Sequence, residues 1–148
     1  MSTELSSSLA NVSCPALEDL ALLRDFGIEE RQALANAGSS VLVPQKSEVI
    51  AEGSSHETLF VVLSGRFLVE RHGVIVAELG VGQVCGEMEM LNPPQASASV
   101  RALTDATIWR ITRTQFRRFL EASPQAGNRF MRLITETFAA RLSEDQIQ

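Results

Sequence analysis

Two carboxylates, Glu87 and Glu89, follow a run of closely spaced glycines and are the residues best placed to do chemistry in this chain. Gly80, Gly82 and Gly86 lead into them, and a glycine lets the backbone come close to a bound molecule. A carboxylate at such a place can accept hydrogen bonds from ligand hydroxyl groups. A metal site on the two glutamates would need additional histidine or carboxylate ligands. We therefore expect no metal here.

Groups that could carry catalysis are sparse. His56 and His72 are the only histidines, and both fall in predicted turns far apart in the sequence. No Ser/His/Asp or Cys/His arrangement is visible. Cys14 and Cys85 form no CxxC pair, so we expect free thiols in a reducing compartment, with Cys85 a small buried residue. The sequence predicts that the protein is not an enzyme and needs no cofactor.

The middle of the chain predicts the framework that positions the glycine loop. Short runs rich in Val, Ile, Leu and Phe alternate with turn residues between about residues 41 and 111. The runs cover 41–43, 49–50, 59–63, 67–69, 74–77, 100–103 and 107–111. Many short strands at near-regular spacing favour an antiparallel roll or sandwich. Glu70-Arg71-His72-Gly73 is expected to form a hairpin turn.

Helices are expected on both sides of these strands, which makes the fold class α+β. A first helix would begin near Pro15 and carry Leu17, Leu20, Ala21 and Leu23 on one face. A second runs from Glu29 to Ala37 and ends at Gly38. Residues 1–14 are rich in serine and are expected to be a disordered tail, as are 144–148.

Two further helices are predicted at the C-terminal end, over about 113–122 and 124–142. Thr112 and Gln115 have the spacing of a capping box for the first of these helices. Ser123, as a cap, and Pro124, in the first turn, mark the start of the second helix. The last helix carries an apolar stripe that could pair with a second copy of the chain or cover its own roll. The stripe predicted as a homodimer interface is Phe130, Ile134, Thr137, Phe138 and Leu142.

The glycine pattern narrows the fold further. Residues 80–87 read GVGQVCGE, which resembles the GxGxxxGE signature of the cyclic-nucleotide-binding domain family. Residues 59–69 are similar to that family's strand–Gly–strand segment, and 97–102 to the end of its phosphate-binding cassette and the following strand. The resemblance covers about 15–143 and implies an antiparallel β-roll of the double-stranded β-helix, or jelly-roll, type. A dinucleotide-binding loop is the rival, but Pro93-Pro94 prevents the long helix that it needs.

The resemblance also implies a binding site for cyclic AMP or cyclic GMP. Its ligand-binding residues would be Gly86, Glu87, Met88, Glu89, Ala96, Ser97 and Ala98. In the family, a glutamate matched here by Glu87 binds the ribose hydroxyl, and an arginine pairs with the cyclic phosphate. Ala96 stands at the arginine position, and no Lys or Arg occurs between Glu87 and Arg101. The cassette is therefore expected to bind a cyclic nucleotide weakly or in an altered way.

Composition sets limits on partners and location. The net charge of −5 argues against non-specific nucleic-acid binding, and the chain shows no signal peptide or membrane span. The basic excess lies in residues 101–148, with 8 basic and 5 acidic side chains. No DNA-binding helices follow the last helix before Gln148, so we expect a stand-alone, cytoplasmic signalling domain with a protein partner.

Two functions remain open at this point. The first is a sensor that binds a cyclic nucleotide or related ligand and passes the change on through its terminal helices. The second is a dimeric protein-interaction scaffold that no longer binds nucleotide. A cupin-like enzyme is a distant third, because cupins rely on an HxH pair with further ligands.

Overall fold

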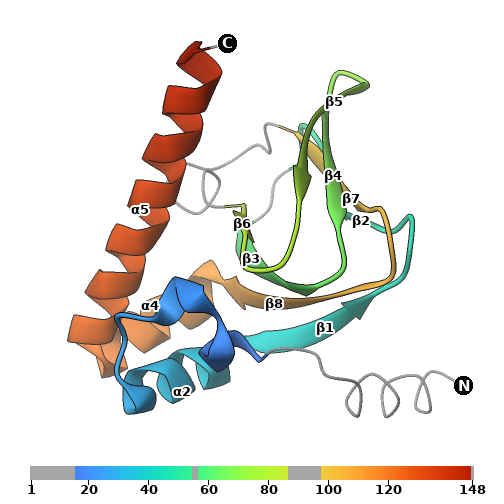
Figure 1. The fold of residues 1–148 in the computed structure, drawn as a ribbon. Coiled ribbons are helices and arrows are strands. Elements are labelled where there is room, and N and C mark those ends of the chain that lie inside the picture. Colours follow the sequence, from blue (N-terminus) through green and yellow to red (C-terminus); the bar gives the residue numbers. More distant parts are fainter. Residues whose placement is uncertain (1–15, 55–56, 87–97, 148) are drawn as a thin grey trace, which may run out of the picture.

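The computed structural model describes residues 16–54, 57–86 and 98–147, which form a β-roll with helices packed against one of its two sheets (Figure 1). One sheet has the strand order β1-β8-β3-β6 and the other β2-β7-β4-β5, and all neighbouring strands are antiparallel. The strands are β1 (Ser39–Val43), β2 (Glu48–Ile50), β3 (Thr58–Ser64), β4 (Phe67–Arg71), β5 (Val74–Leu79), β6 (Val84–Cys85), β7 (Ser99–Ala102) and β8 (Ala106–Thr112). This confirms the predicted α+β fold.

Strands β3 and β8 form the centre of the first sheet and are covered on both faces. Alternate residues of each strand belong to two different apolar clusters. One cluster fills the inside of the roll, and the other lies between the sheet and the helices. Side chains of a strand point alternately to its two faces, so continuous apolar runs such as that of β3 are expected where both faces are buried.

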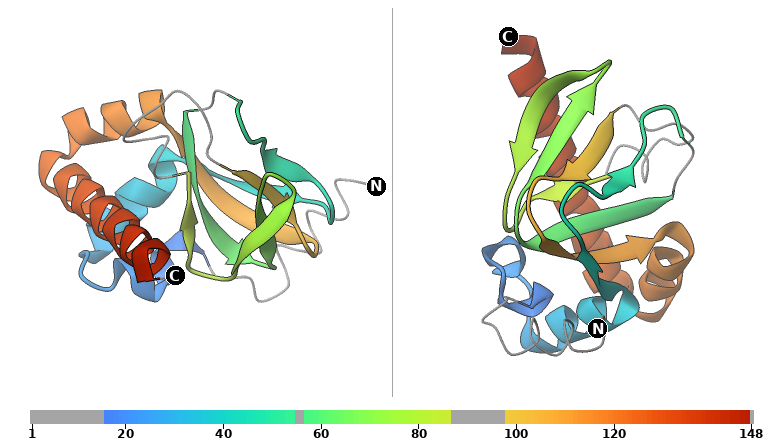
Figure 2. Two further views of the ribbon diagram at one scale, coloured as in Figure 1. Left: turned by 90° about the horizontal axis from the view of Figure 1, so that it is seen from above. Right: turned by 90° about the vertical axis from the view of Figure 1, so that its right-hand side faces the viewer.

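The helices lie to one side of the roll, two of them at the end opposite the β4–β5 hairpin and the longest running alongside the roll towards the hairpin end (Figure 2). They are α2 (Ile28–Ala37), α4 (Arg113–Ala122) and α5 (Pro124–Ile147). Thr112 caps α4 by accepting a hydrogen bond from the Gln115 N–H, and the Gln115 side chain accepts one from the Thr112 N–H. The predicted capping box is therefore confirmed, and α5 continues past the predicted residue 142.

The prediction of a regular first helix was wrong. The segment forms two 3₁₀ turns, Leu17–Asp19 and Ala21–Leu23, separated by an extended Leu20. This break lets all three leucines at 17, 20 and 23 be buried, while Ala21 is exposed. Arg31 of α2 holds the turns in place, because its guanidinium donates to the carbonyl oxygens of Glu18, Arg24 and Phe26.

A single tryptophan, Trp109, lies between the first sheet and the helices and is 1% exposed. Its indole N–H donates to the Ala35 carbonyl of α2 at 3.0 Å, and its ring meets Phe130 of α5 edge-on at 6.2 Å. Gly38 passes so close to this strand that a Cβ there would lie 2.3 Å from the Arg110 carbonyl oxygen. The helices are therefore packed tightly onto strand β8.

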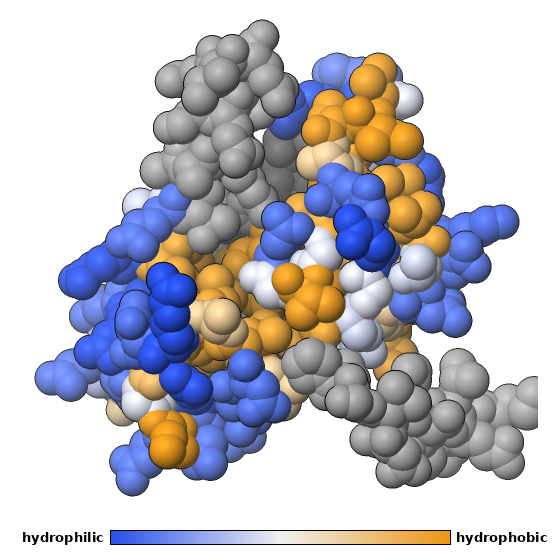
Figure 3. All heavy atoms as spheres, in the orientation of Figure 1, coloured by the Kyte–Doolittle hydropathy of each residue, from blue (hydrophilic) through white to orange (hydrophobic). Residues whose placement is uncertain are grey.

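The β4–β5 hairpin projects from the second sheet. His72 (φ 54°) and Gly73 (φ 79°) form its turn, and two positive φ angles are the geometry of a type I′ hairpin turn. The predicted hairpin is thus confirmed. Val74, Ile75 and Val76 just after the turn are each at least half exposed, and Figure 3 shows apolar surface at this tip.

Candidate functional site

The glycine motif forms a tight turn against the first sheet. The Gln83 side chain accepts a hydrogen bond from the Gly80 N–H at 2.7 Å, and Gly82 (φ 86°) donates to the Val62 carbonyl of β3 at 2.8 Å. Strand β6 follows at once and pairs with β3, with Cys85 opposite Phe60. The sequence pattern did not predict this two-residue strand. It fixes the point from which the chain continues into the predicted ligand loop.

Gly86 and Ala98 are the residues of the predicted ligand site that the structure describes. Gly86 is buried and has a φ of 86°, a conformation that favours glycine, and Ala98 is buried at 8% exposure. Glu87, Met88, Glu89, Ala96 and Ser97 lie outside the described residues. Their roles therefore stay predictions, and what can be described is the protein surface on both sides of the loop.

Downstream of the loop, the polar side chains already have partners within the protein. Ser99 Oγ accepts a hydrogen bond from the Glu52 N–H at 2.9 Å. Arg101, the first cation after the loop, forms an ion pair with Glu70 on the neighbouring strand. The Arg101 guanidinium is thus held on the second sheet by a carboxylate.

His72 and Cys85 fit structural roles, and Cys85 is buried as the sequence predicts. His72 Nδ1 lies 3.0 Å from one Glu52 carboxylate oxygen. The backbone N–H of His72 donates a hydrogen bond to the other carboxylate oxygen at 2.9 Å. Cys85 is 7% exposed and packs in the interior of the roll. Within residues 16–54, 57–86 and 98–147, no group of three or more His, Cys, Asp or Glu is arranged to hold a metal ion.

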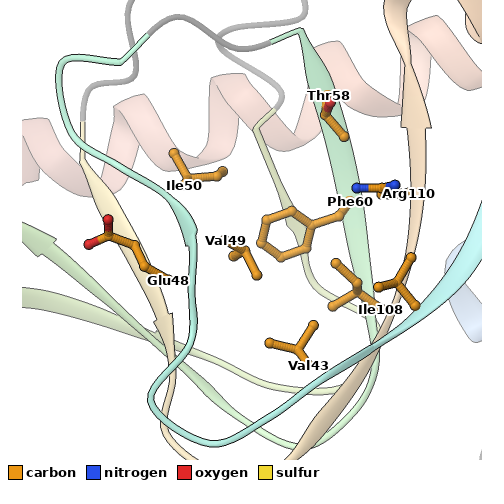
Figure 4. Close-up of a pocket in the computed structure, with 9 residues that line it drawn as sticks. Val43, Glu48, Val49, Ile50, Thr58, Phe60, Ile108 and Arg110 are labelled. Atoms are coloured by element: carbon orange, nitrogen blue, oxygen red, sulfur yellow. The ribbon is translucent and has the colours of Figure 1, made fainter. Parts of the chain in front are cut away.

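A cavity of about 290 Å³ opens into the interior of the roll between the two sheets (Figure 4). Its lining comes from β1, β2, β3 and β8, and it consists of Val41, Val43, Glu48, Val49, Ile50, Thr58, Phe60, Ile108 and Arg110. Most of these side chains are apolar. Glu48 and Arg110 stand on opposite sides of the cavity, with the Phe60 ring between them (Figure 4). Sequence reasoning did not find this cavity, although the alternation along residues 106–110 would have placed Arg110 on the same strand face as Ile108.

The predicted dimer stripe divides into two parts. Phe130 and Ile134 are fully buried in the apolar cluster between the sheet and the helices, so their side chains serve the chain's own core. The side chains of Thr137, Phe138 and Leu142 are outside those described, although the backbone of α5 continues as helix. No described helix is long and apolar enough to cross a membrane.

Comparison with known sequences gives one family match and several relatives. The model of the cyclic nucleotide-binding domain matches residues 41–123. An NTE family protein of Mycobacterium tuberculosis is 31% identical over 118 residues, which are 79% of this chain and 20% of that protein. A cGMP-dependent protein kinase of Caenorhabditis elegans is 34% identical over 101 residues, 67% of this chain and 13% of the kinase. The chain therefore spans a fifth or less of these two relatives.

Solved structures show the same fold. A cyclic nucleotide-binding domain from Methylobacillus flagellatus superposes with a TM-score of 0.79 at 24% identity, covering 86% of this chain and 78% of that one. The catabolite activator protein of Thermus thermophilus gives a TM-score of 0.67 at 25% identity, covering 84% and 57%. Both share the roll and its flanking helices.

Proposed function

The chain belongs to the cyclic nucleotide-binding domain family, and from that premise we propose that it is a regulatory sensor whose cassette binds cyclic nucleotides weakly. The single observation that carries this proposal is the loss of the phosphate's cation. Ala96 stands where the family has its arginine, and Arg101 is already paired with Glu70. The buried Gly86, with its positive φ, supports a loop that still approaches a ligand closely.

The missing charge sets the expected size of the effect. A cyclic phosphate brings one negative charge to the cassette, and a charge-assisted hydrogen-bonded pair contributes about 1.5–3 kcal/mol. Without the arginine, the cassette loses that contribution, and Glu89 adds a like charge to the predicted site. A catalytic role has no support in the described residues, since His72 is held by Glu52 and Cys85 is buried.

Isothermal titration with cyclic AMP and cyclic GMP tests the proposal. We expect the wild-type protein to bind either nucleotide only at high micromolar to millimolar concentration. Ala96→Arg should bind at least about tenfold more tightly, because it restores one charge-assisted pair. Ala96→Gln, which adds a polar side chain without charge, is the control and should change little. Tight binding by the wild type, or equal affinity of all three proteins, would contradict the proposal.

A second candidate function is a dimeric interaction scaffold, and the length of α5 favours it. The helix has 24 residues, or roughly 36 Å, which is longer than one small roll needs to cover its sheet. We propose that the remaining turns, with Thr137, Phe138 and Leu142, pack against a second copy of the chain. The wild type should then be dimeric by light scattering at micromolar concentration.

Phe138→Glu should convert such a dimer to monomers, because it puts a charge into an apolar interface. Glu136→Gln changes an exposed side chain of the same helix that is not part of the predicted stripe. It is the control and should remain dimeric. A wild-type protein that is already monomeric rules out this second function.

A further inference from the structure

An arginine of β8 faces the inside of the roll. Ala106 and Ile108 belong to the interior cluster, whereas Trp109 and Ile111 belong to the cluster beneath the helices. Because side chains alternate along a strand, Arg110 lies on the same face as Ala106 and Ile108. It lines the cavity, and Figure 4 shows its guanidinium beside Phe60.

The Arg110 guanidinium forms no ion pair or hydrogen bond with the residues that the structure describes. Other arginines at the edge of the roll differ in this respect, since Arg66 pairs with Glu78 and Arg101 with Glu70. A cation at the rim of an apolar cavity, exposed to solvent and without a carboxylate partner among the described residues, is available to an anion that enters with an apolar group.

The cavity itself selects for the rest of such a ligand. Val43, Ile50, Phe60 and Ile108 give it apolar walls, and the Phe60 ring offers a flat surface for stacking. Its volume of about 290 Å³ is at the lower end of the range for small-molecule sites. Arg110 is the one cation in the described lining, and Figure 4 shows the Glu48 carboxylate turned away from it, so a ligand with one anionic group fits best.

We propose that the cavity binds a small organic monoanion with a flat apolar body, whose anionic group pairs with Arg110. The apolar body lies against Phe60 and Ile108, and the charge remains at the rim. This inference rests on the proposed ligand-binding role of the roll and names the ligand class. The cassette has Ala96 where the family has an arginine, whereas the roll has Arg110 on β8. Arg110 would therefore bind an anion of a different kind from a cyclic nucleotide.

Two aromatic probes of similar shape test the role of charge. 8-Anilino-1-naphthalenesulfonate carries one sulfonate, and N-phenyl-1-naphthylamine is its neutral counterpart. By isothermal titration, the sulfonate should bind the wild type at least about tenfold more tightly than the neutral compound. Methyl NMR spectra should place the bound sulfonate at Ile50 and Ile108, which line the cavity, and not at the exposed Ile75.

Charge substitutions then identify the anchor. Arg110→Gln should weaken sulfonate binding at least about tenfold and leave the neutral compound unaffected. Arg118→Gln removes an exposed cation of α4 outside the cavity and is the matched control. Glu48→Gln should change sulfonate binding little, because the Glu48 carboxylate is exposed and turned away from Arg110. The side chains of Glu48, Arg110 and Arg118 are exposed, so circular dichroism should show that all three variants are folded.

The outcomes separate this inference from the proposed function. Equal loss of binding in Arg110→Gln and Arg118→Gln, or methyl shifts confined to Ile75, would overturn the Arg110 site. Sulfonate binding that depends on Arg110 would support it even if Ala96→Arg gains no affinity for cyclic nucleotides. In that case the nucleotide proposal fails and the Arg110 site remains.

Discussion

The two faces of strands β3 and β8 have very different surroundings. On one face, Leu59, Trp109 and Ile111 pack beneath the helices and are at most 1% exposed. On the other face, Phe60 and Ile108 point into the roll and line a cavity. The helix-side face is filled, whereas the roll-side face keeps open volume and a cation at its rim.

This difference separates stability from binding within one sheet. Close packing maximises dispersion contacts, and any open volume forfeits some of them. The helix-side face, whose side chains are almost completely buried, therefore keeps these contacts. The roll-side face gives up some of them and keeps space for a ligand.

Removing a large ring from the helix-side face should have the largest effect. Phe130 is fully buried, meets Trp109 edge-on and contacts Phe116 at a ring separation of 5.8 Å. Phe130→Ala should lower the free energy of unfolding by about 3–5 kcal/mol, measured by urea denaturation. Phe130→Leu is the matched control and should cost clearly less. A loss below about 1 kcal/mol would mean that this face is not tightly filled.

Adding one methyl group to the same face should have the next largest effect. A Cβ at Gly38 would lie 2.3 Å from a backbone oxygen and 2.6 Å from the Trp109 ring. Gly38→Ala should therefore destabilise the protein by about 1–3 kcal/mol, the usual range for overpacking. Gly53→Ala would meet no atom within 4 Å, so its cost comes only from its positive φ. Equal unfolding curves for wild type and Gly38→Ala would contradict tight packing at this contact.

The smallest effect comes from one pair of substitutions on the same strand. Ile111→Val and Ile108→Val each delete one methyl group, the first beneath the helices and the second at the cavity wall. Ile111→Val should cost about 1–1.5 kcal/mol and Ile108→Val nearer 0.5 kcal/mol, since a group beside open volume has fewer contacts to lose. Denaturation midpoints in the reverse order would break the comparison between the two faces.

Local patterns were sufficient to predict most of the strands and helices. Each of the seven predicted apolar runs coincides with a strand, although the run 100–103 extends one residue past β7, and the capping box at Thr112 is where the spacing put it. Strand β6 was missed because two residues inside a glycine motif show no periodicity. The first helix was wrong because burial of three leucines outweighs helical regularity in so short a segment.

The site was less accessible to sequence reasoning for a physical reason. The glycine signature predicts a ligand loop, of which the structure describes the buried Gly86 with its positive φ and Ala98. The cavity depends on which of two buried strand faces remains incompletely filled, and alternation alone cannot distinguish them. Arg110 could have been recognised as facing Ile108's side of β8, but only tertiary packing gives that side an open volume.

The chain has one tryptophan and no tyrosine, and this makes Trp109 an internal optical reporter. Its indole lies between α2, β8 and α5, on the face of the sheet opposite to the cavity. A ligand inside the roll does not touch the ring. For a ligand that does not absorb at tryptophan emission wavelengths, a change of Trp109 emission on binding would therefore report movement of the helices, and it would follow transmission of the signal separately from binding itself.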